Sequence, residues 1–342
     1  MKKDVISEEQ KVEERLSRKQ KRIEKKKKSK VRKIVKITLL IILLLIVGVA
    51  GAFTYKVYKN GWGLSGLLST IVGQDEKKLE QLDRFNVLLM GESLNLTDTI
   101  IIASYDPKLQ DVSMLSIPRD TFTGINKKKA TAFQKINALY QSSPEKTLEA
   151  VNKITGLDIK YYLCVDTKAL REIVNEIGGV YFDVPIDMKY DDKKQNLHIN
   201  VRAGYQLLDG DKAEQVVRFR HNNDGTTYSS EYGQEDLGRM RTQREFLKTV
   251  AKQTLKAQNV FKINSILDIY KNNVTTNLDM DLVKQYIPYA VNINMDEIET
   301  ETLPGEPEKC NGVWLFIHNN EETELMVNKL FRGINSGENE EI

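Results

Sequence analysis

The sequence predicts an α/β domain that follows a single membrane-spanning helix. Between residues 84 and 333, short apolar runs alternate with longer amphipathic segments, a pattern typical of a sheet with helices on both faces. An uncharged apolar run at 37–55 precedes this region and itself follows a strongly basic tail. The 342 residues leave room for an anchor and one large domain.

The tail at residues 1–36 is basic. It carries 16 Lys/Arg and 6 Asp/Glu, a net charge of +10, which leaves −7 for residues 37–342 out of the overall +3. We interpret the tail as a topology signal that also contacts anionic lipid headgroups, not as a nucleic-acid-binding arm. No nucleic-acid partner is therefore predicted.

The apolar run at 37–55 has no charge over 19 residues, close to the roughly 20 that cross a bilayer as a helix. The positive-inside rule places the basic tail in the cytoplasm and residues from about 56 outside the cell. A cleaved signal peptide is the rival interpretation, but the preceding basic region is too long and the apolar run exceeds a typical signal core. We therefore predict a retained single-pass anchor in the plasma membrane.

Two stretches outside the domain pattern are predicted to lie outside the folded domain. Residues 56–83, with several glycines and a charged run at 75–78, are predicted to be a juxtamembrane connector, and residues 334–342 a disordered tail. Cys164 lies in an alternating strand pattern, where free cysteine is common. A disulfide with Cys310 stays open, because the sequence does not show whether the two are close.

The domain is expected to alternate strands and helices along its length. A Gly178–Gly179 pair suits the end of a helix, and Asp279 and Asp281 suit the start of one. Strands are predicted at 86–90, 99–105, 111–117, 160–166, 180–184, 197–202 and 298–303, and helices at 144–155, 167–177, 209–217, 236–257, 279–290 and 321–333.

The first three predicted strands end in polar clusters. Asp98 stands between two threonines, and Arg119 follows Pro118, which stops ladder pairing and lets the arginine leave the sheet. A guanidinium fork at a strand end suits phosphate oxygens. The plain alternative is that Arg119 pairs with Asp120 or another surface acid.

A second cluster of cations lies downstream. If the segment around Phe219 is extended, Arg218 and Arg220 share a face, and two adjacent cations suit a diphosphate between them; a solvated edge is the alternative. Asp236 is predicted to cap the next helix, in which Arg239 and Gln243 share a face. An arginine in the first turn opposes the helix dipole unless an anion is bound there.

The segment at 222–234 between these arginines is rich in Gly, Ser, Tyr and Asn, and is either a lid or a long surface loop. No serine nucleophile elbow, phosphate-binding glycine loop, Cys–His pair or zinc-type spacing is present in the sequence. The candidate chemistry is therefore phosphoryl transfer by positioning and charge neutralisation, with arginines and a metal ion as the main agents.

At these residues the chain resembles the LytR-CpsA-Psr family of membrane-anchored cell-wall enzymes. The matching motifs follow in order over residues 84–333: Ser-Ile-Pro-Arg-Asp-Thr at 116–121, Lys-Ile-Asn-Ala at 135–138, and further segments at 178–185, 205–210, 218–221, 237–243, 303–305 and 311–313.

The resemblance implies an α/β/α sandwich around a mixed central sheet, with an apolar pocket for a polyprenyl chain. It implies an extracellular phosphotransferase that moves an anionic glycopolymer, of teichoic acid or capsule type, from undecaprenyl diphosphate to peptidoglycan. By the resemblance, the ligands of the lipid diphosphate are Arg119, Arg218, Arg220 and Arg239, with Gln243 as a supporting contact. Asp98 carries over as the aspartate associated with Mg²⁺ (or Mn²⁺).

The chain departs from the family pattern in two places. Where the family often has Gly-x-Asp, this chain has Gly91-Glu92-Ser93, so Glu92 is the candidate second metal ligand. The loop at 222–234 is also longer than expected. Asp98 or Asp120 is the candidate general base. Two other functions stay open: a non-catalytic protein that binds polyprenyl phosphates as a regulatory or wall-binding protein, and a lipid pyrophosphatase.

Overall fold

The computed structural model describes residues 8–74, 81–93, 96–193, 196–233 and 235–332. It divides into two compact units, residues 1–59 and residues 60–342. The predicted charged run at 75–78 and the predicted tail at 334–342 lie outside the described residues.

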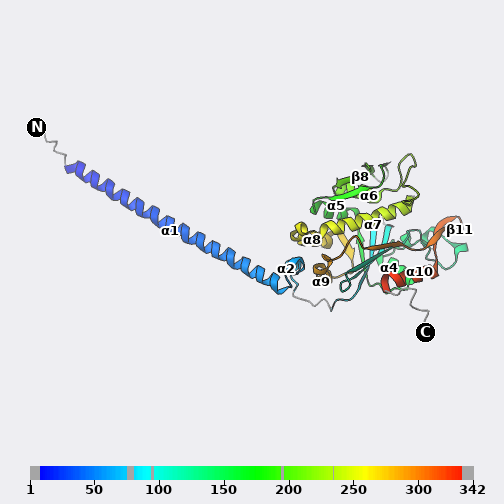
Figure 1. The fold of residues 1–342 in the computed structure, drawn as a ribbon. Helices are drawn as coiled ribbons and strands as arrows, with labels where there is room; N and C mark the ends of the chain where they lie inside the picture. Colours follow the sequence, from blue (N-terminus) through cyan, green and yellow to red (C-terminus); the bar gives the residue numbers. More distant parts are fainter. Residues whose placement is uncertain (1–7, 75–80, 94–95, 194–195, 234, 333–342) are drawn as a thin grey trace. The chain divides into compact units, whose positions relative to one another are not determined.

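The described residues of the first unit form one helix, α1 (Glu8–Lys59) (Figure 1). Its segment Val35–Lys59 is 25 residues long and apolar enough to cross a membrane, which is consistent with the predicted anchor at 37–55. The helix continues through the basic residues on its N-terminal side, because lysine and arginine are good helix formers.

The second unit is built on a six-stranded mixed sheet with the order β10-β3-β2-β1-β4-β9. β1 pairs antiparallel with β2 and parallel with β4, while β3 pairs parallel with β10. The predicted mixed sheet is therefore confirmed. Its strands are β1 (Phe85–Ser93), β2 (Leu96–Asp106), β3 (Asp111–Ser116), β4 (Tyr161–Val165), β9 (Val274–Thr276) and β10 (Glu299–Thr302).

Helices cover both faces of this sheet. On one face Leu88 and Ile102 pack against Leu148 of α4 (Pro144–Thr155) and Val327 of α10 (Asn320–Val327). On the other face Leu89 lines a cavity, described below, together with residues of α5 (Thr167–Glu176) and α7 (Glu235–Thr254). The alternating burial of neighbouring strand residues follows from the two-residue period of a strand. The α/β/α arrangement is confirmed.

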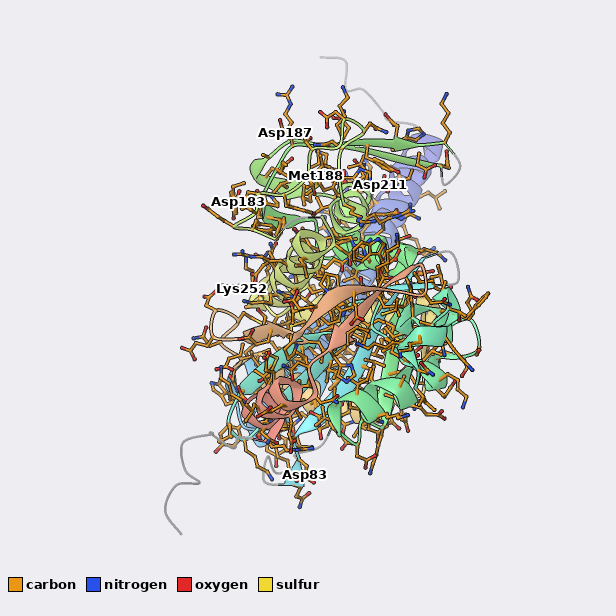
Figure 2. The ribbon with its side chains drawn as sticks, turned by 90° about the vertical axis from the view of Figure 1, so that its right-hand side faces the viewer. Asp83, Asp183, Asp187, Met188, Asp211 and Lys252 are labelled. Carbon is orange, nitrogen blue, oxygen red and sulfur yellow. The ribbon has the colours of Figure 1, made fainter. Side chains whose placement is uncertain are left out.

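A second core lies around α5, α7 and α6 (Gly210–Arg218), where Phe219 and Phe246 are fully buried. It includes two small antiparallel sheets, β5 (Val180–Val184) with β8 (Gly204–Leu208) and β6 (Met188–Asp192) with β7 (Leu197–Val201). Figure 2 shows Asp183 of β5, Met188 of β6 and Asp187, directly before β6, at the opposite end of the unit from Asp83.

Side-chain caps fix several helix starts as their sequences suggest. Ser143, Asp166 and Asp209 each accept a hydrogen bond from a backbone N–H in the first turn of α4, α5 and α6. The predicted helix at 321–333 ends sooner, because α10 passes into a π-helical turn at Asn328–Arg332.

Several elements were not predicted. The predicted connector at 56–83 contains α2 (Gly63–Val72), which buries Leu68 and Val72. Other unpredicted elements include the short helix α3 (Ile136–Leu139), the helix α8 (Ile263–Asn273), the 3-10 helix η4 (Ala257–Lys262), the strands β6, β8 and β9, and the hairpin of β11 (Gly305–Cys310) and β12 (Val313–His318). The predicted helix at 279–290 is present as α9 (Met280–Ala290). Cys164 and Cys310 are free and buried, so no disulfide joins them.

Candidate functional site

A cavity of about 410 Å³ opens between the central sheet and the second core. Residues from β1, β2, α5, α6, α7 and the β6–β7 hairpin line it. Its polar lining includes Glu92, Asp98, Thr99, Arg119, Arg218, Arg220, His221, Arg239 and Gln243, and its apolar lining includes Leu89, Met90, Val165, Leu170, Tyr190, Leu197, Val217 and Leu247. The structure thus brings the predicted diphosphate and metal ligands and Gln243 into one cavity, but not the candidate base Asp120.

A β-bulge presents Asp98 to this cavity. Gly91 of β1 pairs with Thr99 and Glu92 pairs with Thr97, so Asp98 is an extra residue in β2. Such an extra residue bends the strand and redirects its side chain. The sequence placed Asp98 at a strand start, whereas it lies within β2, and no sequence signal marked the bulge.

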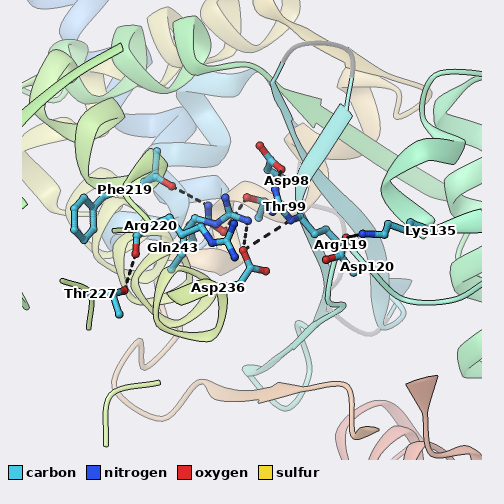
Figure 3. Close-up of polar contacts among 12 residues, drawn as sticks. Asp98, Thr99, Arg119, Asp120, Lys135, Phe219, Arg220, Thr227, Asp236 and Gln243 are labelled. Atoms are coloured by element: carbon cyan, nitrogen blue, oxygen red, sulfur yellow. Dashed lines mark hydrogen bonds and ion pairs between the residues drawn. The ribbon is translucent and has the colours of Figure 1, made fainter. Parts of the chain in front are cut away.

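Arg119 lies in the turn that follows β3. Its backbone is fixed there, because its carbonyl accepts a hydrogen bond from the Asn137 N–H at 3.1 Å. The Arg119 Nη1 contacts Asp98 Oδ1 at 2.6 Å, and its Nε lies 3.8 Å from Asp236 Oδ1 (Figure 3). Burial opposes the charge, yet the carboxylates of Asp236 and Asp98 outweigh it and raise the pKa of Arg119.

Arg239 shares a carboxylate with Arg119. Its Nη2 contacts Asp236 Oδ1 at 2.5 Å, and its side chain is only 6% exposed. Burial lowers the pKa of Arg239, and the nearby Arg119 and Arg220 guanidinium groups act in the same direction, against Asp236 and Asp98. The predicted capping role of Asp236 is wrong: α7 begins one residue earlier, and the carboxylate binds arginines instead.

Arg218 and Arg220 flank a buried aromatic residue. Arg218 is the last residue of α6 and Phe219 is extended, so the condition of an extended segment around both arginines is met at Phe219 but not at Arg218. Phe219 is fully buried and meets Tyr228 edge to face at 5.5 Å, which fixes the backbone between the two arginines. The Arg218 Nη1 contacts Glu214 Oε1 at 3.0 Å.

Gln243 ties the two sides of the cavity together. Its Oε1 accepts a hydrogen bond from the Thr99 hydroxyl of β2 at 2.8 Å, and its Nε2 donates to the Val217 carbonyl of α6 at 2.8 Å. The amide is therefore occupied by the protein on both sides. It fixes β2 near Asp98 and α6 next to Arg218.

The carboxylate of Glu92 accepts a hydrogen bond from the Tyr140 hydroxyl at 2.7 Å. Burial and this hydrogen bond raise the pKa of Tyr140. Asp120 lies apart from this arrangement, because it pairs with Lys135 at 2.9 Å (Figure 3) and is not among the residues that line the cavity.

The described residues contain no group of three or more His, Cys, Asp or Glu side chains that could hold a metal ion. Asp98 and Glu92 nevertheless line the same cavity as the arginines. Mg²⁺ is commonly bound by one or two carboxylates together with water and substrate phosphates. The donor set therefore fits an ion that the substrate completes, and not an ion caged by protein alone.

The described part of the loop at 222–234 is packed against α7. Tyr228 and Tyr232 stack at 5.4 Å, and the Arg241 guanidinium lies 4.4 Å from the Tyr232 ring centre. Any Cβ on Gly238 would lie 2.1 Å from the Gly233 carbonyl oxygen, so a glycine is required at this close approach. Of the two interpretations, the structure favours a surface loop held in place over a free lid.

The sequence reasoning missed three features of the site. Asp236 bridges Arg119 and Arg239, Tyr140 holds Glu92, and α5 supplies apolar lining through Leu170. The spacing of Asp236 and Arg239, three residues apart in a helix, was the available signal for the first.

Comparison with known proteins gives one family. The model of the LytR_cpsA_psr family matches residues 57–332. An uncharacterized protein of Staphylococcus aureus is 30% identical over 225 residues, 64% of this chain and 51% of that protein, so the chain spans about half of its length. The polyisoprenyl-teichoic acid–peptidoglycan teichoic acid transferase TagU of Oceanobacillus iheyensis is 29% identical over 72% of this chain and 76% of its own.

Solved structures share the fold. The crystal structure of Bacillus subtilis TagV matches 73% of this chain and 98% of its own, with a TM-score of 0.59 and 24% identity.

Proposed function

Because the chain belongs to the LytR_cpsA_psr family, we propose that it is a membrane-anchored glycopolymer phosphotransferase. It moves an anionic glycopolymer, of teichoic acid or capsule type, from undecaprenyl diphosphate to peptidoglycan. The observation that carries this proposal is the single cavity in which four arginines, Arg119, Arg218, Arg220 and Arg239, meet an apolar wall. In this proposal the tail lies in the cytoplasm and the domain faces the cell wall.

The two kinds of lining match the two parts of a lipid diphosphate. Guanidinium groups bind phosphate oxygens through paired N–H donors, and the diphosphate supplies negative charge to four arginines that line one cavity. Leu170, Leu197 and Leu247 line the same space and offer apolar contact to the first units of the polyprenyl chain.

The reaction is a substitution at phosphorus. An acceptor hydroxyl of peptidoglycan attacks the phosphorus linked to the sugar, and the bond from that phosphorus to the bridging oxygen breaks. The polyprenyl monophosphate leaves, and the hydroxyl proton passes to a carboxylate of the cavity or to solvent. The arginines stabilise the charge that develops on the phosphoryl and leaving oxygens, which is the main task in phosphoryl transfer.

Asp98 and Glu92 are the residues that would hold Mg²⁺ or Mn²⁺ in this cavity. Such an ion supplies charge neutralisation on the departing phosphate when bound. Asp98 also orients Arg119 through their 2.6 Å contact. Asp120 is not proposed as a base, because it pairs with Lys135 and does not line the cavity.

A transfer assay tests the proposal. The full-length protein in bilayer nanodiscs is incubated with a lipid-diphosphate-linked glycan, Mg²⁺ and peptidoglycan oligomers, and glycan attached to peptidoglycan is measured. We expect Arg119→Ala to lose about 10²- to 10³-fold in rate. Arg332→Ala is the matched control, because Arg332 binds the Gly156 carbonyl and lies outside the cavity lining. No transfer by the wild type, or equal transfer by Arg119→Ala, would refute the proposal.

A further inference from the structure

Two large aromatic side chains lie exposed on neighbouring segments of the folded domain. Trp62, directly before α2, is 58% exposed, and Phe261, in η4, is 71% exposed. The segments are neighbours because Leu68 of α2 and Val260 of η4 belong to one hydrophobic cluster. α8 and α9 contribute to the same cluster, and Figure 1 shows both beside α2.

The chain brings one of these side chains to the membrane by connectivity. Trp62 follows Lys59, the last residue of the apolar helix, by three positions. Three extended residues reach at most about 11 Å. Trp62 is therefore within that reach of the last residue of the anchor, whatever course the connection takes.

The chemistry of the neighbouring segments suits a lipid interface. α2 contains no charged residue, and tryptophan is enriched where a membrane meets water. Lys256, directly before η4, is exposed and precedes Phe261 by five residues. Lys262, which follows Phe261, instead donates to the Glu176 carbonyl at 2.8 Å. Basic residues near a bilayer are attracted by anionic headgroups. A lone exposed aromatic needs no explanation, but two such residues beside an exposed lysine and next to an anchor do.

We propose that this surface, made of Trp62, Phe261 and Lys256, docks on an anionic bilayer, with both aromatic rings in the headgroup region. We call it the bilayer-facing surface. Docking holds the domain in one orientation on the membrane from which its lipid substrate comes. The proposal rests on the anchor, not on the transfer reaction, so it stands or falls independently of the activity.

Tryptophan fluorescence of the full-length chain tests this proposal. The chain has two tryptophans, Trp62 and Trp314. In one variant, Phe261→Trp is combined with Trp62→Phe and Trp314→Phe, so position 261 is the sole reporter. The protein is reconstituted in phosphatidylcholine–phosphatidylglycerol vesicles with or without brominated acyl chains. Position 261 discriminates better than Trp62, because it is far from the anchor along the chain. Contact of position 261 with lipid therefore requires that the domain docks on the bilayer, and does not follow from the covalent link to the anchor.

We expect the reporter at 261 to emit at shorter wavelength than in water and to lose at least half of its intensity to brominated lipid. Adding Lys256→Glu should reduce that quenching. Trp62→Phe alone leaves Trp314 as the control. Trp314 lies on β12, whose partner β11 is at the opposite end of the domain from α2 (Figure 1), and it should stay unquenched.

Four results would overturn the proposal. Water-like, unquenched emission from position 261 would show that the surface stands away from the bilayer. Water-like, unquenched emission from Trp62 would show this too, when it is measured in the Trp314→Phe variant, which leaves the bilayer-facing surface intact. If the tryptophan emission shifts to the blue without lipid and in proportion to protein concentration, the surface binds a second copy of the chain. If the shift requires peptidoglycan, the surface binds a glycan.

Discussion

At the scale of single residues, the site is organised by a few carboxylates among many guanidinium groups. Asp236 contacts both Arg119 and Arg239, and Asp98 contacts Arg119 from the other side. Buried charges are stable only when they are paired, and removing one partner leaves the other uncompensated. These acids keep the arginines in place until an anionic substrate arrives.

Asp236→Asn tests this shared pairing. We expect the free energy of unfolding to fall by about 1–3 kcal/mol, because Arg239 is left buried with weaker neutralisation. Inorganic pyrophosphate should raise the melting temperature of the variant more than that of the wild type. Urea denaturation measures the first effect and a thermal scan the second. Asp296→Asn, which removes an exposed partner of Lys252, should leave the unfolding curve unchanged. A wild-type curve for Asp236→Asn would contradict the assigned role.

Asp98→Asn tests the proposed metal site. We expect the transfer rate to fall by about 10- to 100-fold and the Mg²⁺ concentration for half-maximal rate to rise. Asp120→Asn is the neighbouring control and should keep the wild-type Mg²⁺ dependence, because Asp120 pairs with Lys135. The metal assignment is wrong if titration with Mg²⁺ gives the same curve for wild type and Asp98→Asn.

Which residues gather in the site could be predicted from the sequence, but their pairing could not. The motifs around Arg119, Arg218 and Arg239 pointed to one anionic ligand, and the cavity contains all three. The partner of Arg119 depends on a bulge in β2, and that of Arg239 on the start of α7. A shift of one residue at a bulge or a helix start changes the direction of a side chain, but it hardly changes the spacing of apolar residues from which elements are predicted.

At the scale of elements, α7 joins the two halves of the site. Gln243 on this helix binds Thr99 of β2 and the Val217 carbonyl of α6. Arg244, the next residue, donates to Ser116 of β3 and Thr302 of β10. The polar contacts of these two adjacent residues thus fix α7 across the sheet, while Arg239 lines the cavity.

Gln243→Ala tests this positioning role. We expect kcat/KM to fall about tenfold through a higher KM for the lipid substrate, since two hydrogen bonds that hold Arg218 and Asp98 in place are lost. Gln253→Ala is a matched control on the same helix, because its amide donates to the Tyr181 carbonyl at an exposed position. Steady-state kinetics decides: a wild-type KM with a reduced kcat would instead assign Gln243 to the chemical step.

The sequence predicted elements well where the apolar pattern was regular. The runs that became β1, β2 and β3 have a buried apolar face, and the three strands lie next to one another in the sheet. β6, with the sequence Met-Lys-Tyr-Asp-Asp, has almost no strand signal of its own. It forms because Met188 packs into the second core, so tertiary contacts decide its structure.

At the scale of the whole molecule, buried phenol and thiol groups limit the stable pH range. Burial raises the pKa of Cys164 to about 11 and of Tyr162 to about 12. Both groups stay protonated in the native state, whereas the unfolded chain ionises at its ordinary, lower values. Their contribution to stability is therefore complete below pH 9 and declines as the pH rises through 11.

The urea concentration at the midpoint of unfolding should accordingly be constant between pH 7 and 8.5 and fall steadily above pH 9. Cys164→Ser should show a smaller fall between pH 9 and 11, since it lacks the thiol that titrates there. A midpoint that stays constant to pH 11 would mean that these groups do not couple to folding.

The chain combines a helix able to span a membrane with a cavity lined by arginines and apolar side chains. The central claim is that this cavity transfers a glycopolymer and does not merely bind or hydrolyse its lipid carrier. Transfer and hydrolysis share the first product, polyprenyl monophosphate, and differ in their dependence on the acceptor.

The most direct measurement is the release of polyprenyl monophosphate by the full-length protein, with and without peptidoglycan oligomers, counted against glycan joined to peptidoglycan. The account predicts one monophosphate released for each glycan attached, and little release without the acceptor. Equal release without the acceptor would identify a lipid pyrophosphatase, and tight lipid binding with no release would identify a binding protein; either result would contradict the account.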